Sequence, residues 1–442
     1  MNPKVVTRFA PSPTGHLNIG GVRAGIHAFL FARHNKGGFI VRIEDTDTER
    51  SKKEFEDSIL DSLAWLNITY DTLYRQSEHA KRHEELLHKL VDQGLAYVSK
   101  EEPKEEGGRT EVIRFKNPNK VVTFIDEVRG EISFDTAELK DFDIAKSFTE
   151  PIFHFAVVAD DWDEGVTHVI RGEDHISNTP RQILIQEALG APRPVYAHLP
   201  LIVGDDRSKL SKRKGAKPLI EYRDLGYLPE AIFNYDTFLG WHPGGEKEVF
   251  TQDELIELFT LERVQKNPAA FDETKLLWFN HEHLKRLSNN EFEERLGVFL
   301  KKREEELPSF FSQIASLVRE RSQTLLEAAE SLKTDFGFMG DSVSYDKKLL
   351  LKGAKAEATD VATYLNKTIE MLDALSDEGF TQEKVKEIVF PYATEVGRSA
   401  VLWPMRVSLS GREKSPDPFT LAGLLGKEKT IQRLKDALAV LK

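Results

Sequence analysis

The chain has 442 residues, enough for about three domains of typical size. Hydrophobic residues make up 40% of it and charged residues 30%, a balance that excludes global disorder. The net charge of −12 argues against a nucleic-acid binder of the usual basic kind, although a local basic groove on an acidic body remains compatible with it.

The sequence contains no cysteine, which excludes disulfides, thiolate nucleophiles and cysteine-type zinc sites. Residues 1–10 lack the apolar stretch of a secretory signal, and no run of about 20 apolar residues occurs. We therefore expect a cytoplasmic protein that does not span a membrane.

The first hundred residues predict alternating strands and helices. A strand, a glycine-containing turn, a helix and a second strand make a βαβ unit, which starts a doubly wound parallel sheet. The expected elements are a strand at 4–9, a break at 11–15, a helix at 22–35, a strand at 39–43, and amphipathic helices at 52–66 and 77–93.

The pattern then changes at 100–109, a charged stretch with Pro and Gly that is typical of a surface connection. Short β-rich segments at 111–115, 121–125 and 131–134 predict an inserted subdomain. The alternating pattern resumes with expected strands at 153–159, 166–170 and 195–201 and an expected helix at 177–189.

From about residue 219 the periodicity becomes helical, with expected helices at 229–239, 253–259, 272–287, 290–301 and 309–332. The fold class that we predict is therefore α/β. It consists of an N-terminal doubly wound (Rossmann-type) parallel sheet with an inserted α+β subdomain, followed by an all-α C-terminal half.

The first chemical motif runs from Arg8 to Gly21 (RFAPSPTGHLNIGG) and connects a strand to a helix. Its glycines permit a tight turn and close approach of a ligand to the backbone. The helix N-terminus that follows offers free N–H groups to phosphates. A glycine- and proline-rich turn is also common in α/β proteins, so this segment alone leaves both interpretations open.

Two further motifs follow predicted strands, at the edge where open α/β sheets bind ligands. The segment Arg42–Asp47 (RIEDTD) could hold an amine or ribose hydroxyls, but taken alone it fits a solvated acidic loop better. In the segment Arg171–Gln182 (RGEDHISNTPRQ), the arginine suits a carboxylate or a phosphate. Its Asp174 and His175 suit either a ligand or the cap of the next helix.

The last motif is the basic segment Arg207–Lys217, which carries six Lys or Arg side chains between glycines at 204 and 215. A cationic loop of this kind clamps a polyphosphate and stabilises the charge on a leaving pyrophosphate. A solvated basic loop or a nucleic-acid patch is the alternative.

Taken in order, these motifs resemble those of the class I aminoacyl-tRNA synthetases, and specifically the bacterial-type glutamyl-tRNA synthetases. Residues 8–21 are similar to the first family signature and residues 209–213 to the second. The similarity continues through 234–243, 271–280 and 401–406, so it covers nearly the whole chain.

The resemblance implies attachment of L-glutamate to tRNA(Glu) in two steps. Glutamate attacks the α-phosphate of ATP, which gives glutamyl-adenylate and pyrophosphate, and the acyl group then passes to the 3′-terminal adenosine of the tRNA. Mg²⁺ is implied as the partner of ATP, activation generally needs bound tRNA, and we expect a monomer.

The resemblance also implies a role for each matching residue. The glutamate pocket would contain Arg8 at the side-chain carboxylate, Arg171 at the α-carboxylate end, and Ala10, Ser12, Glu44 and Phe153. The ATP site would contain Gly20, Gly21, Asp174, His175, Lys212, and Leu201 and Ile202, whose backbone would place the adenine. Lys212, Asn18 and Lys209 would act on the phosphates, and Asp47 would contact the 3′-terminal adenosine of the tRNA.

The implied domains are a catalytic domain at 1–100 and 151–215, with an acceptor-end subdomain at 101–150 inserted in it. A helical connective domain at 216–305 and a helical anticodon-binding region at 306–442 follow.

This sequence departs from the family pattern at three places. Asn18 replaces a signature histidine, while His16 stands where the family often has tyrosine, and Phe153 replaces a pocket tyrosine. The cysteine-containing stretch of many relatives is absent, since residues 96–99 run directly into the charged connection. We therefore expect no zinc site.

The sequence leaves two alternatives open. A non-discriminating or tRNA(Gln)-directed paralogue would share every motif above. A catalytically degenerate tRNA-binding protein would explain Asn18, although the joint presence of Arg8, Glu44, Arg171 and Lys212 opposes it. A glutaminyl-tRNA synthetase is disfavoured by the segment 11–15 and by the helical C-terminal half. A tRNA-independent relative that modifies a tRNA base is also disfavoured, because it would lack that helical half.

Overall fold

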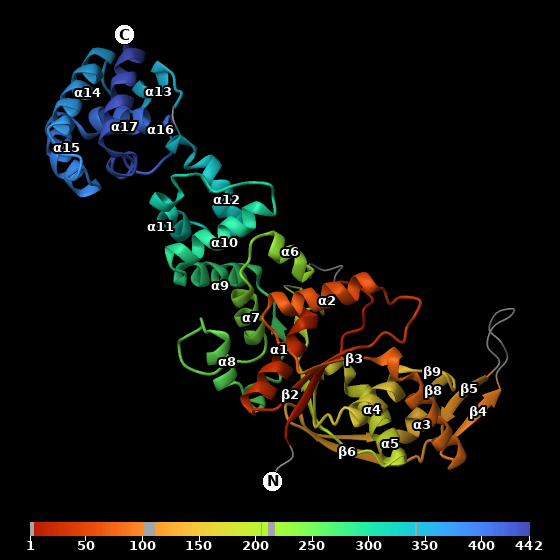
Figure 1. The fold of residues 1–442 in the computed structure, drawn as a ribbon. Coiled ribbons are helices and arrows are strands. Elements are labelled where there is room, and N and C mark those ends of the chain that lie inside the picture. The colour runs from red at the N-terminus through yellow and green to blue at the C-terminus, as the bar shows by residue number, and fades with distance from the viewer. Residues whose placement is uncertain (1–3, 101–110, 205, 211–216, 341–342) are drawn as a thin grey trace. The chain divides into compact units, whose positions relative to one another are not determined.

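The computed structural model of the protein describes residues 4–100, 111–204, 206–210, 217–340 and 343–442 (Figure 1). The chain divides into two compact units, Met1–His283 and Leu284–Lys442. Within the described residues, none of the helices is long and apolar enough to cross a membrane.

A seven-stranded sheet forms the centre of the first unit. Its strands are, from edge to edge, β3 (Thr72–Arg75), β2 (Gly38–Ile43), β1 (Val6–Phe9), β10 (His168–Gly172), β11 (Val195–Leu199), β6 (Val121–Asp126) and β7 (Gly130–Asp135). All neighbouring strands run parallel except β6 and β7, which form an antiparallel hairpin. The chain leaves β1 toward β2 on one side and returns on the other side at β10, so the strand order reverses at β1.

Helices cover both faces of this sheet, because alternate residues of each strand point to opposite faces. Ile170 and Ala197 join a core with α1 (Ile19–His34), α7 (Pro229–Phe238) and α8 (Gln252–Leu258). Their strand neighbours Val169 and Tyr196 join a second core. This second core contains α3 (Ala80–Asp92), α4 (Phe153–Asp163) and α5 (Thr179–Leu189). The predicted doubly wound α/β class is confirmed.

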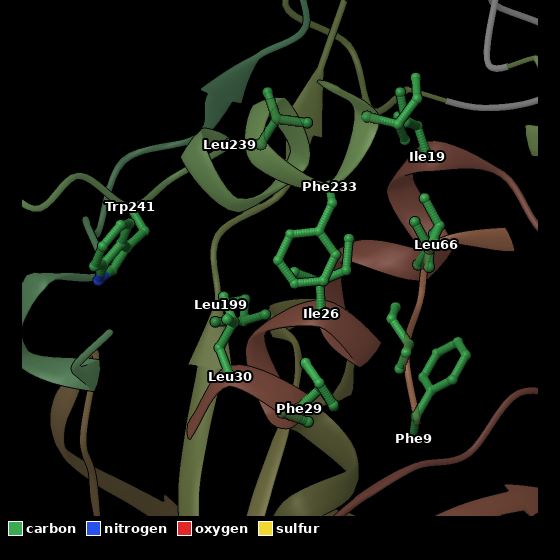
Figure 2. Packing of buried hydrophobic residues seen from close by; sticks show 14 of the residues in the cluster. Phe9, Ile19, Ile26, Phe29, Leu30, Leu66, Leu199, Phe233, Leu239 and Trp241 are labelled. Carbon is green, nitrogen blue, oxygen red and sulfur yellow. The ribbon is translucent and has the colours of Figure 1, made fainter. Parts of the chain in front are cut away.

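Helix α1 packs its apolar face between the sheet and α7. Figure 2 shows Ile26, Phe29 and Leu30 of α1 grouped with Phe233 of α7 and Leu199 of β11. The spacing of the α1 residues at i, i+3 and i+4 places them on one helix face. The helix begins three residues before the predicted Val22, since Asn18 is its N-cap.

The strand predicted at 153–159 is wrong, because this segment forms the first two turns of α4. Its residues Phe155 to Ala159 are all buried. A short apolar run that is buried on all sides has no amphipathic period, so the sequence pattern does not separate a strand from a helix there. Strand β3 was not predicted, and the single helix expected at 309–332 is two helices, α11 (Phe311–Arg321) and α12 (Leu325–Thr334).

The segment expected as an insertion contributes to two sheets. Strands β4 (Ala96–Lys100), β5 (Glu111–Phe115), β8 (Phe142–Ser147) and β9 (Glu150–Pro151) form a separate antiparallel sheet. The β6–β7 hairpin instead extends the central sheet, where Asp126 pairs with Tyr196.

The remaining elements are mainly helical. In the first unit they are α2 (Lys53–Trp65), α6 (Leu219–Asp224), and the paired short strands β12 (Ile202–Val203) and β13 (Ala269–Ala270). Helix α9 (Glu273–Arg286) spans the division between the units. The second unit contains α10 (Asn289–Lys301), α11, α12, α13 (Lys347–Lys352), α14 (Ala358–Asp373), α15 (Gln382–Val396), α16 (Arg398–Ser410) and α17 (Pro418–Leu441). The C-terminal half is largely helical, as predicted, but in its described residues it is not all-α, because the two-residue strand β13 lies within it.

Candidate active site

A cavity of about 640 Å³ lies where the carboxyl ends of β1, β2 and β10 meet. This is the place where an open parallel sheet whose strand order reverses binds its ligand. The cavity brings together most of the residues that the sequence singled out: Arg8, Ala10, Ser12, Gly20, Gly21, Glu44, Asp47, Phe153, Arg171, Asp174 and His175. Phe153 contributes its ring from the start of α4, 5.5 Å between centroids from the ring of His175.

Arg8 is held from one side only. Its side chain is 5% exposed, and its Nε donates to Asp161 Oδ1 at 3.1 Å. Within the described residues, this bond is its sole recorded hydrogen bond, so Nη1 and Nη2 are left for a ligand in the cavity.

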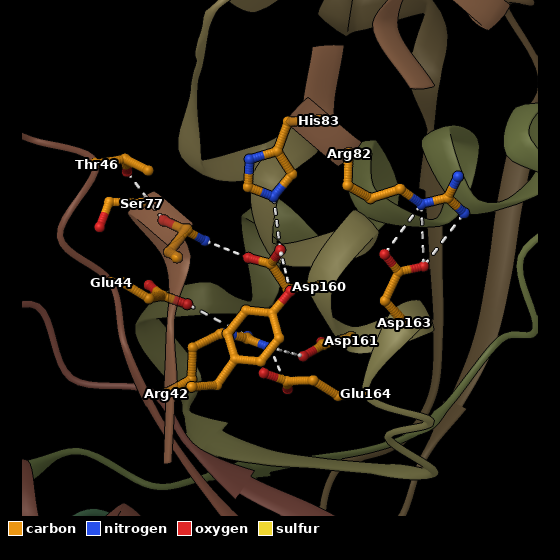
Figure 3. Close-up of polar contacts among 12 residues, drawn as sticks. Arg42, Glu44, Thr46, Ser77, Arg82, His83, Asp160, Asp161, Asp163 and Glu164 are labelled. Carbon is orange, nitrogen blue, oxygen red and sulfur yellow. Dashed lines mark hydrogen bonds and ion pairs between the residues drawn. The ribbon is translucent and has the colours of Figure 1, made fainter. Parts of the chain in front are cut away.

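Arg42 is not among the residues that line the cavity, and it is completely buried (Figure 3). Its Nη1 donates to Asp161 at 2.7 Å and to Glu164 at 2.8 Å, and its Nη2 donates to Glu44 at 3.3 Å. The guanidinium thereby ties the cavity wall at Glu44 to helix α4.

The carboxylates around Arg42 differ in proton affinity. Burial raises the pKa of Glu164 to about 7, helped by Asp161 and Asp160 and opposed by Arg42. Burial also raises the pKa of Glu44, again against Arg42. At Asp161 burial acts in the same direction, but Arg8 and Arg42 outweigh it and the pKa is lowered. Asp161 is therefore the firmly ionised member of the cluster.

Arg171 contacts only uncharged hydrogen-bond partners among the described residues. Its Nε donates to His198 at 3.2 Å, and its Nη2 donates to Thr179 at 2.9 Å and to Gln182 at 2.8 Å. His198 accepts at Nε2 because its Nδ1 side faces Asp126 at 2.6 Å.

Burial lowers the pKa of Arg171 to about 10, which still leaves the guanidinium charged at neutral pH. A buried cation without an acidic partner attracts an anionic group of a ligand. The arrangement therefore favours a carboxylate or a phosphate beside Arg171.

The helix N-terminus at α1 forms another wall of the cavity. Asn18 Oδ1 accepts from the backbone N–H of Gly21 at 2.8 Å, so this side chain acts as the N-cap. His16 is directed to α2 instead, where it contacts Ser58 at 2.9 Å and the ring of Phe55.

Lys209 is bound to the cavity residue Asp174, with Nζ 2.7 Å from Oδ2. Burial raises the pKa of Asp174, but Lys209 outweighs burial and the pKa is lowered. Lys212, for which the sequence predicts a contact with the phosphates, lies outside the described residues.

Burial lowers the pKa of His175 to about 4, so its ring is uncharged at neutral pH.

The backbone of Leu201 and Ile202, the predicted adenine-binding segment, forms hydrogen bonds with three other residues. The backbone N–H of Leu201 donates to Glu173 at 2.7 Å, and its carbonyl accepts from Ala269 at 2.9 Å. The carbonyl of Ile202 accepts from Leu210 at 2.8 Å. Of the two predicted adenine residues, Ile202 lies close to Gly20 of the cavity wall.

Asp47 lies at the cavity rim and also lines a second, adjoining cavity of about 290 Å³. Arg50 Nε donates to its carboxylate at 2.7 Å, and the pKa of Asp47 is lowered by this bond. Lys146 of β8 lines both cavities, so residues from the antiparallel sheet contribute to the rim.

Sequence reasoning missed the acidic residues at the C-terminal end of α4, including its C-cap Glu164, that support the arginines. Asp161 and Glu164 bond Arg42, and Asp160 accepts from Gln76 at 2.6 Å and contacts His83 at 2.6 Å (Figure 3). The signal was present as two adjacent aspartates directly after an apolar run. The expected strand at 153–159 hid it, because that strand ended directly before the two aspartates and left them outside any predicted element.

No group of three or more His, Cys, Asp or Glu side chains in the described parts of the chain is placed to hold a metal ion. The expectation that the protein lacks a zinc site stays a prediction.

A family model described as "tRNA synthetases class I (E and Q), catalytic domain" matches residues 4–109 and 99–278, and one described as "Anticodon binding domain" matches 282–438. The chain belongs to the class I tRNA synthetases of the E and Q group. The first match ends at residue 278 and the second begins at residue 282, close to the division between the compact units at His283 and Leu284.

Among curated relatives of this synthetase is glutamate--tRNA ligase 1 of Alkalilimnicola ehrlichii, which is 39% identical over 98% of both chains. Glutamate--tRNA ligase 1 of Caldanaerobacter subterraneus subsp. tengcongensis is also 39% identical, over 99% of this chain and 98% of its own.

Solved structures are similar over the full length. A glutamate tRNA ligase from Elizabethkingia meningosepticum, crystallised in complex with its amino acid, has a TM-score of 0.88 and 32% identity and covers all of both chains. The glutamate-tRNA synthetase of Elizabethkingia anophelis has a TM-score of 0.84 and 32% identity, covering 99% of this chain and all of its own. The family predicted from the sequence is confirmed.

Proposed function

We propose that this synthetase attaches L-glutamate to tRNA(Glu) through a glutamyl-adenylate. The observation that carries the proposal is the pair of cavity arginines: among the described residues, Arg8 has Nη1 and Nη2 left for a ligand, and Arg171 has Nη1. Glutamate carries two carboxylates, and two cations in one cavity match that pattern.

In the first step, Arg8 holds the side-chain carboxylate and Arg171 holds the α-carboxylate end of glutamate. The α-carboxylate oxygen attacks the α-phosphorus of ATP, and the bond to the bridging oxygen of the β-phosphate breaks to release pyrophosphate. Ala10, Ser12, Glu44 and Phe153 complete the glutamate pocket in this proposal, which their place in the cavity wall supports. The work of these residues is to bind and orient.

The nucleotide would lie against the start of α1 and the end of β10. Gly20 and Gly21 offer close approach at the positive end of the helix dipole, and Asp174, His175, Leu201 and Ile202 would surround the nucleoside. Lys212, Lys209 and Asn18 would act at the phosphates. Mg²⁺ enters with ATP as part of the nucleotide substrate.

In the second step, a hydroxyl of the terminal adenosine of tRNA attacks the acyl carbon, and AMP leaves. Asp47 at the cavity rim would contact that adenosine. We assign residues 101–150 to the acceptor end, 216–305 to a connective domain and 306–442 to anticodon binding. We also propose a monomer that works in the cytoplasm.

Pyrophosphate exchange into ATP tests the proposal. We expect exchange with glutamate in the presence of total tRNA, little exchange without tRNA, and none with glutamine. Charging of separate tRNA(Glu) and tRNA(Gln) transcripts then identifies the acceptor, and charging of tRNA(Gln) alone would indicate the paralogue. A protein that binds tRNA but shows no exchange under any condition would be the degenerate binder, and the proposal would be wrong.

A further inference from the structure

We propose that Asp161 is a positioning residue that fixes the orientation of Arg8 and thereby sets the preference for glutamate over glutamine. This inference rests on the proposed role of Arg8 at the side-chain carboxylate. Its starting point is one carboxylate oxygen, Asp161 Oδ1, which accepts from Arg8 Nε at 3.1 Å and from Arg42 Nη1 at 2.7 Å. Three elements meet at this atom, namely β1, β2 and α4.

The bond at Nε matters because a guanidinium is flat and carries its donors in a fixed fork. When Asp161 holds Arg8 at Nε, Nη1 and Nη2 remain as the paired donors. The cavity wall includes Arg8, so this pair is available to a ligand carboxylate. A carboxylate accepts two parallel bonds from such a pair, whereas an amide presents one acceptor and one NH₂ group that opposes the second donor.

Arg42 cannot take the place of Arg8 in this arrangement. Its side chain is 0% exposed, and its Nη nitrogens are engaged with Asp161, Glu164 and Glu44. Arg42 instead donates to Asp161, as Figure 3 shows for the pair. Asp161 therefore couples a purely structural arginine to the arginine that faces the ligand.

In Asp161→Asn the amide oxygen can still accept a neutral hydrogen bond, but Arg8 loses the stronger charge-assisted bond that fixes its rotation. A turning guanidinium offers single donors to either an amide or a carboxylate. We therefore expect weaker glutamate binding together with relaxed discrimination, and a smaller change in the rate of the bound complex.

The last residue of α4, Asp163, and its C-cap, Glu164, provide matched controls for this proposal. Glu164 pairs with the same Arg42 at 2.8 Å but has no recorded bond to Arg8, so Glu164→Gln removes a buried acid from the same cluster. Asp163 lies between the two in sequence and pairs with Arg82 at 3.0 Å, outside the cavity. Asp163→Asn removes an ion pair from the same helix.

The experiment measures kcat and KM for glutamate and for glutamine in tRNA-dependent pyrophosphate exchange, with the full-length protein and total tRNA. For Asp161→Asn we expect KM for glutamate to rise about tenfold or more, kcat to change less, and the glutamate-to-glutamine ratio of kcat/KM to fall by a similar factor. For Glu164→Gln and Asp163→Asn we expect both quantities within about threefold of wild type. Equal effects in Asp161→Asn and Glu164→Gln would overturn the proposal, as would an unchanged ratio in Asp161→Asn.

A second variant keeps the proposal testable if Asp161→Asn does not fold. Arg8→Lys retains the charge and the acid but has a single nitrogen, so it should lose discrimination to a similar extent. Wild-type discrimination in Arg8→Lys would contradict the role of a fixed fork. If the wild-type protein itself shows no exchange with glutamate, the proposed function is wrong. If the wild-type protein is active and the Asp161→Asn and Arg8→Lys variants discriminate as well as it does, only this inference is wrong.

Discussion

Asn18 Oδ1 accepts a hydrogen bond from the backbone N–H of Gly21 at 2.8 Å, so Asn18 is the N-cap of α1. This is the residue that replaces the histidine of the first family signature. The cap satisfies one of the N–H groups that a helix N-terminus otherwise leaves free. Asn18 thus has a structural role at the same place where the proposal needs a phosphate contact.

These two roles of Asn18 can be separated by substitution. Asn18→Ala should lose about 1 kcal/mol of stability with the cap and also lower the rate of pyrophosphate exchange. Asn18→Asp keeps a capping oxygen but adds a negative charge beside the phosphates, so it should retain stability and lose more activity. Asn18→His should leave activity unchanged or raise it.

Thermal unfolding and exchange assays on the same preparations check these expectations for Asn18. Thr251→Ala is the control, since Thr251 caps α8 and does not line the cavity. If Asn18→Ala is silent in exchange while His16→Ala abolishes it, the assignment of the phosphate contact is wrong.

Arg8→Leu should remove most use of glutamate, because the cavity loses the cation that faces the side-chain carboxylate. Asp161 also loses one of the two partners that it has in the described part of the chain. We expect kcat/KM for glutamate to fall at least about a hundredfold, measured by exchange. Arg33→Leu is the control, since it removes an arginine that pairs with Asp71 outside the cavity. Near-native kcat/KM in Arg8→Leu would contradict the assignment.

Lys212→Ala should lower kcat by orders of magnitude with a smaller effect on KM for ATP. The reason is that the charge it would meet grows as the bond between the α- and β-phosphates breaks. Lys209→Ala is the comparison, because Lys209 is partly neutralised by Asp174 at 2.7 Å and should cost less. Loss of ATP affinity with an unchanged kcat in Lys212→Ala would refute a role in the transition state.

Glu164 should make the protein less stable as the pH rises from about 4.5 to 7. Burial raises its pKa from 4.5 to about 7, so in this window the folded state holds a proton that the unfolded chain has released. Over this pH range the free energy of unfolding of the wild type should therefore fall by up to about 3 kcal/mol more than that of Glu164→Gln. Urea unfolding of both proteins at several pH values measures the difference, and a flat difference or one of opposite sign would show that Glu164 does not titrate there.

The sequence predicted which residues line the cavity better than it predicted which residues hold them in place. Arg8, Glu44 and Arg171 each lie at or just after the end of a predicted strand, and parallel strands bring their carboxyl ends to one edge of a sheet. Their proximity therefore followed from the alternating pattern. The helix at 153–163 was mistaken for a strand because its apolar residues 155–159 are all buried and carry no amphipathic period.

By itself the sequence determined the α/β class, the family and the set of side chains at the end of the sheet, since these depend on periodicity and on motif order along the chain. Only the tertiary structure decided what holds those side chains. Asp161 reaches Arg8 across 153 residues of sequence and Arg42 across 119. Whether an acid contacts a buried arginine depends on how a helix packs on a sheet, and no local pattern encodes that contact.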